Sequence, residues 1–110
     1  MGRRREIEQF NVYWVNLDPT VGSEIKKTRP CIIISPDSLN MHLNTVIIAP
    51  LTSTLRNYPF RPHCMVAGKE GEVVIDQLKA VDKSRIGSYL ASLKEIEIMR
   101  IKDVLHQMFE

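Results

Sequence analysis

The stretch RPCIIIS, residues 29–35, carries the strongest fold signal in the sequence. It is a continuous apolar run, rich in β-branched side chains and too short for a helix, and this predicts a buried strand. Two lysines, Lys26 and Lys27, come just before the arginine that opens the run. Three cations gathered where the chain enters its own core indicate a ligand outside the fold, since a turn and one polar residue would satisfy a structural need.

Short strands are predicted on both sides of this run. The predicted strands cover residues 11–17 (NVYWVNL), 29–35, 45–54 (TVIIAPLTST), 58–67 (YPFRPHCMVA) and 72–81 (EVVIDQLKAV), with one turn of helix at 38–42 and a hairpin turn at 68–71. Two prolines favour an edge position for the strand at 58–67. The mixed charges and Gly22 of residues 20–28 predict a long exposed loop.

The hydrophobic period changes to that of a helix near the C-terminus. The residues that share one arc of the helical wheel are Leu93, Ile98, Ile101, Val104, Leu105, Met108 and Phe109. Lys94 and Glu97 interrupt the arc, whereas Ile96 and Met99 lie outside it and are either simply exposed or part of a dimer contact. Five short strands and one closing helix predict a mainly β (α+β) fold, a small and partly open β-barrel.

Length and composition limit the class of protein. A chain of 110 residues with 44% hydrophobic and 25% charged residues is one domain, here expected at residues 11–110 after a charged arm at 1–10. No apolar run is long enough to span a membrane, and no apolar stretch follows the arginines at 3–5 as in a secretory signal. We therefore expect a cytoplasmic protein with reduced thiols at Cys31 and Cys64. A net charge of +2 permits a nucleic-acid partner without requiring one.

The common enzyme signatures are absent from the sequence. There is no P-loop, G-x-G-x-x-G, H-E-x-x-H or G-x-S-x-G motif. His63 and Cys64 are adjacent on a predicted strand and so point to opposite faces, which disfavours a zinc site that includes Cys31 or His42. We expect no metal and no cofactor.

The remaining candidates for chemistry lie at strand ends. Arg29 opens one buried strand, and the hydroxyl run Thr52-Ser53-Thr54 closes another, so a guanidinium and a hydroxyl could converge as a phosphate clamp. The plainer alternative is a surface arginine paired with a carboxylate and threonines that suit a strand end. Asp76, a carboxylate among apolar residues, needs a partner, and a strand-borne arginine is the obvious one.

Several segments in order resemble the MazF/PemK toxins of bacterial toxin–antitoxin systems. They are VYWVNLDPTVGSEIKKTRPCIIIS, TVIIAPLTST, YPF and VVIDQLKAVDKSRI, and together they extend over nearly the whole chain. The resemblance implies an SH3-like barrel with a C-terminal helix, a homodimer, and a metal-independent, sequence-specific endoribonuclease acting on single-stranded RNA. It also implies a cognate antitoxin with an acidic, partly disordered segment.

The resemblance assigns roles to particular residues. Arg29 and Thr52 match the family's central catalytic pair. Candidates for catalysis or RNA binding are Glu24, Ser53, Asp76 and Gln77, and Lys26 and Lys27 are candidates for holding the RNA backbone. The expected products are a 2′,3′-cyclic phosphate and a 5′-hydroxyl.

The sequence also departs from the family pattern. Phe10-Asn11 replaces a common Gly-acidic pair, and Ser23 and Val74 stand where some members have a histidine and an arginine. The general base therefore stays open. A non-enzymatic alternative with the same fold is a CcdB-like toxin that binds DNA gyrase through its C-terminal helix, and another is a plain RNA-binding module.

Overall fold

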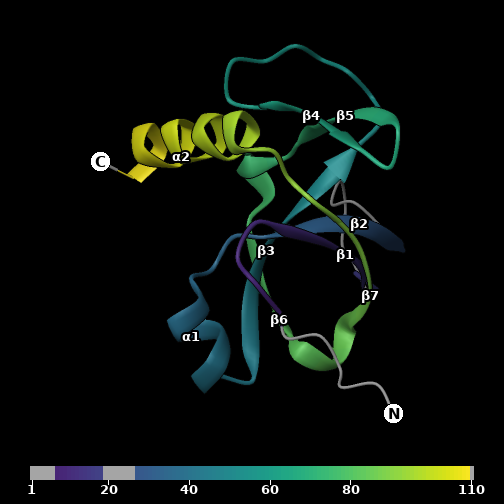
Figure 1. Cartoon of the computed structure of the whole chain (residues 1–110), viewed down its shortest axis with the longest axis vertical. Coiled ribbons are helices and arrows are strands. Elements are labelled where there is room, and N and C mark those ends of the chain that lie inside the picture. Colours follow the sequence, from purple (N-terminus) through teal and green to yellow (C-terminus); the bar gives the residue numbers. More distant parts are fainter. Residues whose placement is uncertain (1–6, 19–26, 110) are drawn as a thin grey trace.

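The computed structural model describes residues 7–18 and 27–109, which form one strongly curved antiparallel sheet and a C-terminal helix (Figure 1). The strands are β1 Asn11–Asn16, β2 Thr28–Ile33, β3 Thr45–Thr52, β4 His63–Val66, β5 Lys69–Val73, β6 Lys79–Asp82 and β7 Ile86–Ser92. The helices are α1 Asp37–His42, α2 Glu95–Phe109 and two short 3₁₀ helices, η1 Ile75–Gln77 and η2 Lys83–Arg85. This confirms the predicted mainly β fold with a closing helix.

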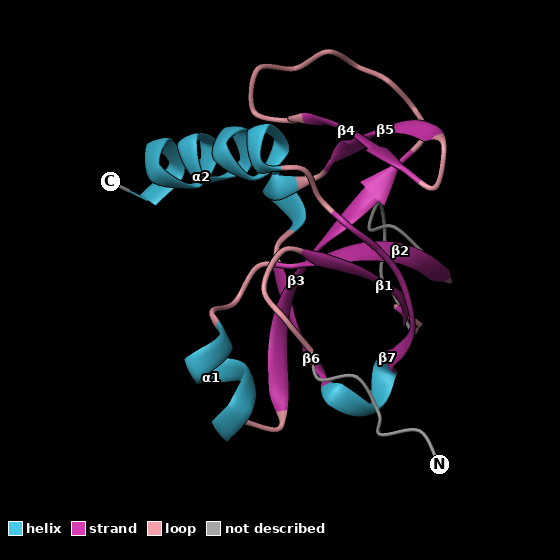
Figure 2. Ribbon diagram, viewed as in Figure 1, coloured by secondary structure: helices cyan, strands magenta, loops and turns pink. Residues whose placement is uncertain are grey.

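The long strand β3 organises the sheet (Figure 2). The strand order is β4-β5-β3-β2-β1-β7, and β6 also pairs with β3. The first part of β3 bonds to β6, its middle to β2, and its last two residues, Leu51 and Thr52, bond to β5. Because its partners change along its length, β3 joins the two parts of the curved sheet, and its C-terminal end lies where they meet.

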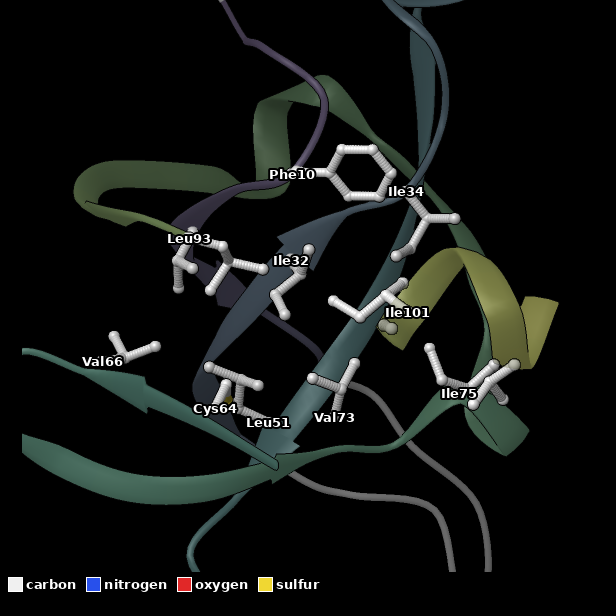
Figure 3. Close-up of a cluster of buried hydrophobic side chains, with 13 residues drawn as sticks. Phe10, Ile32, Ile34, Leu51, Cys64, Val66, Val73, Ile75, Leu93 and Ile101 are labelled. Atoms are coloured by element: carbon white, nitrogen blue, oxygen red, sulfur yellow. The ribbon is translucent and has the colours of Figure 1, made fainter. Parts of the chain in front are cut away.

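Two apolar clusters fill the two faces of the curved sheet. The cluster covered by α2 consists of Phe10, Val12, Ile32, Ile34, Ala49, Leu51, Cys64, Val66, Val73, Ile75, Leu93, Ile101 and Val104 (Figure 3). The second consists of Tyr13, Val15, Leu17, Cys31, Ile33, Val46, Ile48 and Val81. Along β2, Cys31 and Ile33 join one cluster while Ile32 joins the other, which explains why this strand is continuously apolar.

The segment predicted as a single strand at 72–81 is broken in two. β5 ends at Val73, the 3₁₀ turn η1 follows, and β6 begins at Lys79. Val74 and Ile75 are both buried although they are neighbours, so the alternation of a strand fails there. Composition alone does not reveal this corner, because the apolar run continues through it.

β7 was also missed, so the described residues contain seven strands instead of five. Its sequence, IGSYLAS, mixes small polar and apolar residues and gives a weak strand signal. Its pairing with β1 has two register irregularities, and only Ile86, Leu90 and Ala91 are half-buried. A strand that packs this unevenly does not show the regular period on which a prediction depends.

The hairpin between β4 and β5 is tighter than predicted. Ala67 and Gly68 alone form the turn, with φ angles of 51° and 78°, as a two-residue hairpin requires. Lys69 therefore already belongs to β5, which corrects the predicted turn at 68–71. β4 is shorter than the predicted strand, because residues 53–62 form a loop.

The described end of the predicted N-terminal arm, residues 7–10, lies against the sheet. Phe10 is buried, and its N–H donates to the carbonyl oxygen of Ile33 at 2.7 Å. The side chain of Gln9 donates to the carbonyl oxygen of Ile34 at 2.9 Å. None of the helices within the described residues is long and apolar enough to cross a membrane.

Helix α2 follows the predicted period over most of its length: its residues Ile101 and Val104 are buried, and Ile96 and Met99 are 51% and 57% exposed. The prediction is wrong at the last turn, where Met108 and Phe109 of the predicted arc are 42% and 69% exposed. Glu97, which interrupts the apolar arc, is nevertheless buried. Its Oε1 accepts from the N–H of Lys94 and its Oε2 from the N–H of Met65, each at 2.8 Å. This carboxylate therefore caps α2 and ties it to β4.

Candidate functional site

Arg29 lies on β2 at the open end of its pairing with β3. The last paired residues are Cys31 of β2 and Pro50 of β3, and Arg29 and Thr52 each stand two residues beyond that pair, at the same end. Because side chains alternate along a strand, both belong to the face that carries Cys31 and Pro50. Arg29 is exposed. The predicted convergence of the two strand ends is thus supported by the register.

Thr52 is half-buried at the end of β3, directly opposite Glu72 of β5. Its Oγ1 accepts a hydrogen bond from the N–H of Thr54 at 3.1 Å. This bond occupies one lone pair of the hydroxyl and leaves its proton available to an acceptor outside the chain. Ser53, the next residue, is exposed.

A second cation shares this face and was not anticipated. Lys79 of β6 lies opposite Ile48, which in turn lies opposite Ile33 of β2, so Lys79 and Arg29 belong to the same side of the sheet. Burial raises the pKa of the Cys31 thiol to about 12, and the charges of Arg29 and Lys79 act against this rise. Both cations therefore lie near Cys31. Only the pairing between strands could have revealed Lys79.

Asp76 pairs with an arginine, as predicted, but not with one carried by a strand. Nε and Nη2 of Arg61 donate to its two carboxylate oxygens, each at 3.0 Å. Arg61 belongs to the loop before β4. These hydrogen bonds hold the pKa of the Asp76 carboxyl below its ordinary value. Gln77 follows in η1 and is half-buried.

The loop that carries Arg61 also presents two stacked aromatic rings. The rings of Tyr58 and Phe60 lie 5.1 Å apart between centroids, at 17° to one another. The guanidinium carbon of Arg61 lies 5.2 Å from the centroid of the Tyr58 ring. Tyr58 and Phe60 are 42% and 41% exposed.

Glu72 is a fully buried carboxylate that the sequence analysis did not select. Its Oε2 accepts from the N–H of Arg56 at 3.0 Å and of Asn57 at 2.8 Å, and lies 3.3 Å from Nε2 of His63. Burial alone would raise the pKa of the Glu72 carboxyl, but the two N–H groups and the nearby cations lower it. Within the described residues Oε1 has no partner. An acidic residue directly before the apolar run VVI was the available signal.

The base of the loop before β2 is held closed by hydrogen bonds. Lys27 has a φ angle of 69°, and its N–H donates to Oδ1 of Asp18 at 3.0 Å. Its carbonyl oxygen accepts from the N–H of Leu17 at 3.0 Å. Arg85 donates to the carbonyl oxygens of Asn16 and Asp18. Lys27 is exposed, while the predicted site residues Glu24 and Lys26 lie outside the described residues.

No three His, Cys, Asp or Glu side chains come together as a metal site in residues 7–18 and 27–109. Cys31 and Cys64 are buried free thiols in different apolar clusters. His63, the first residue of β4, instead lies close to two carboxylates, 3.8 Å from Glu70 and 3.3 Å from Glu72.

These features define a small β-barrel protein with a cationic edge, formed by Arg29 and Lys79, beside the hydroxyl group of Thr52. Comparison with known proteins gives its family: the chain belongs to the PemK-like, MazF-like toxins of type II toxin–antitoxin systems, whose sequence pattern matches residues 8–109. Among curated proteins it is similar to an endoribonuclease MazF of Staphylococcus epidermidis, with 28% identity over 105 residues, 90% of this chain and 88% of that protein.

Solved structures show the same fold. MazF of Deinococcus radiodurans superimposes with a TM-score of 0.84 at 24% identity, over 96% of this chain and 97% of that one. A MazE–MazF structure from the same organism gives 0.78 at 25% identity, over 96% of both chains. A mycobacterial endoribonuclease in complex with its cognate antitoxin gives 0.76 at 24%, over 91% of both chains.

Proposed function

We propose that the protein is the toxin of a toxin–antitoxin pair and acts as an endoribonuclease on single-stranded RNA. Family membership and the endoribonuclease MazF relative support the activity. The observation that carries the proposal is the register of β2 and β3, because it brings Arg29 and Thr52 to the same end and face of one strand pair. The family match gives no support to a gyrase-binding toxin, which would need neither residue.

The chemistry is a transesterification within the RNA. The 2′-hydroxyl loses its proton and its oxygen bonds to the adjacent phosphorus. The bond from phosphorus to the 5′-oxygen then breaks, and that oxygen takes up a proton. A 2′,3′-cyclic phosphate and a 5′-hydroxyl result. The nucleophile is already attached beside the phosphate, so the reaction needs charge stabilisation and proton transfer but no metal ion.

Arg29 and Thr52 have different roles in this reaction. The guanidinium of Arg29 stabilises the extra negative charge on the phosphorane. The hydroxyl of Thr52, whose oxygen already accepts from Thr54, donates its proton to a phosphate oxygen and fixes the position of the group. Lys79 adds positive charge on the same face.

Other residues are assigned to binding. Lys27, exposed before β2, contacts the RNA backbone, and we assign Lys26 to the same task. Ser53, Gln77 and Glu24 remain candidates for contacts with the RNA, with cleavage confined to a preferred base sequence. Asp76 acts indirectly through Arg61, since both oxygens of its carboxylate already accept from that guanidinium. We assign no general base.

Two protein partners follow. An antitoxin with an acidic, initially disordered segment would fold over the cationic edge and block it. We also propose a homodimer, in which Ile96 and Met99 are covered by the second copy. Met65 of β4 is also 50% exposed, and its N–H bonds to Glu97 of the same helix.

The test is cleavage of a long single-stranded RNA in excess EDTA. Wild-type protein is compared with Arg29→Ala, Thr52→Ala and the control Arg100→Ala, which removes an exposed arginine from α2. Arg29→Ala should cleave at least roughly 10²-fold more slowly, the usual cost of losing one transition-state donor. The downstream fragments should accept a kinase label without phosphatase treatment, because they begin with a 5′-hydroxyl.

The outcomes separate the functions. Discrete cuts by the wild type and Arg100→Ala, lost in the other two variants, would establish the nuclease and reveal its preferred sequence. Undiminished cleavage by Arg29→Ala would refute the assigned site. No cleavage by folded wild-type protein would refute the nuclease itself, and inhibition of gyrase supercoiling would then be the next assay.

A further inference from the structure

The buried residue Glu72 lies directly across from Thr52 of the proposed cleavage site, on the neighbouring strand. Glu72 is the cross-strand partner of Thr52, and it is the only fully buried charged side chain among the described residues. Carboxylates are rarely enclosed in this way unless hydrogen bonds compensate for the lost water. Its placement against Thr52 therefore calls for a reason beyond packing.

The hydrogen bonds of Glu72 go to the chain that leaves Thr52. Oε2 accepts from the N–H groups of Arg56 and Asn57, and it also lies 3.3 Å from His63, the first residue of β4. One oxygen atom thus contacts the middle of the loop at residues 53–62 and the residue that directly follows it. Asn57 has a φ angle of 58°, a conformation that most residues avoid and that these bonds help to maintain.

The same loop sets the orientation of the Thr52 hydroxyl. The N–H of Thr54 donates to Oγ1 of Thr52, and Thr54 lies two residues before the N–H of Arg56 that Glu72 holds. On the other side, a Cβ atom on Gly71 would come within 2.9 Å of the Thr52 carbonyl oxygen. Thr52 is therefore fixed between the β5 backbone and a loop whose path depends on Glu72.

We propose that Glu72 is a positioning residue for RNA cleavage: its buried carboxylate fixes residues 53–57 and thereby directs the Thr52 hydroxyl toward the scissile phosphate. The inference rests on the proposed nuclease function. An apolar residue of similar size would fill the same volume but would leave the N–H groups of Arg56 and Asn57 without their acceptor, so a carboxylate here is explained by the loop geometry that it imposes.

The test separates kcat from KM with a short RNA that contains one cleavage site. Glu72→Leu keeps the volume and removes the acceptors, so kcat should fall by about tenfold to 10²-fold, the range for a small misplacement of a reacting group, with KM nearly unchanged. Glu72→Gln keeps one acceptor oxygen for the two N–H groups and should recover most of the lost kcat.

Glu97 provides the matched control. It is also a buried carboxylate that accepts from two backbone N–H groups, but those belong to Lys94 and Met65. Glu97→Leu should retain wild-type kcat at a temperature where circular dichroism shows the protein folded, even where its stability is lower. Should Glu72→Leu fail to fold, Glu72→Asp replaces it. The aspartate keeps the carboxylate, but its side chain is shorter by one methylene and cannot reach both N–H groups, so the same fall in kcat is expected.

The result that overturns the inference is a folded Glu72→Leu or Glu72→Asp variant with wild-type kcat. An equal loss of kcat in Glu97→Leu would also overturn it, because the effect would then reflect stability alone. Failure of the proposed function is a different result: the wild type itself would not cleave, or Arg29→Ala would cleave as fast as the wild type.

Discussion

Replacing Glu97 by alanine should destabilise the fold strongly. The side chain is buried, and its two oxygens accept from the N–H groups of Lys94 and Met65, each at 2.8 Å. Hydrogen bonds to a charged acceptor contribute about 1.5–3 kcal/mol each. The N–H of Lys94 stands at the exposed start of α2, where water can partly replace the carboxylate. We therefore expect Glu97→Ala to lower the free energy of unfolding by about 2–4 kcal/mol.

Urea unfolding, followed by circular dichroism at one fixed protein concentration, measures this change. Glu97→Gln keeps one acceptor oxygen and should lose about half as much. The control is Glu95→Ala, which removes an exposed carboxylate from the same helical turn and should change stability by no more than about 0.5 kcal/mol. If Glu97→Ala were no less stable than Glu95→Ala, the link between α2 and β4 would contribute nothing and the reasoning would fail.

Two further substitutions and one labelling experiment have definite expected outcomes. Glu72→Gln should lower the free energy of unfolding at neutral pH. Because the folded protein lowers the pKa of this carboxyl below its ordinary value of 4.5, the difference from wild type should shrink as pH falls through that range, as measured by urea titration at several pH values. Gly71→Ala places a Cβ atom 2.9 Å from the Thr52 carbonyl oxygen, so RNA cleavage should slow, and unchanged rates would contradict this close contact. Burial raises the pKa of Cys31 and Cys64 to about 12, so both thiols should resist iodoacetamide at pH 8 until the protein unfolds, as mass spectrometry can show.

The sequence predicts those parts of the fold in which burial produces a recognisable pattern of apolar residues. β2 and β3 are buried on both faces, so their apolar runs were recognisable as strands. The corner at Val74 and Ile75 was not recognisable, because an apolar run that turns between two parts of a sheet looks like one that continues straight. β7 was missed for the opposite reason, since its half-buried residues have no regular period.

The residues of the candidate site likewise separate into those that the sequence predicts and those that it does not. Arg29 and Thr52 could be selected because each stands at the end of a buried strand, and a resemblance gave them roles. Lys79 could not be selected, because only the pairing of β6 with β3 brings it to their face. When the role of a side chain depends on the register between strands, the sequence cannot reveal that role before the strand pairing is known.

Glu72 shows the same limit at the level of hydrogen bonding. Its position after Gly71 resembles an ordinary polar residue in a hairpin, yet its partners are backbone N–H groups 15 and 16 residues away. Nothing in the identities of Arg56 and Asn57 signals this contact, since any residue except proline supplies the same donor. The arginine partner of Asp76 could be expected because both groups are charged side chains. The partners of Glu72 are backbone groups, and such a contact emerges only when the loop at 53–62 is folded against β5.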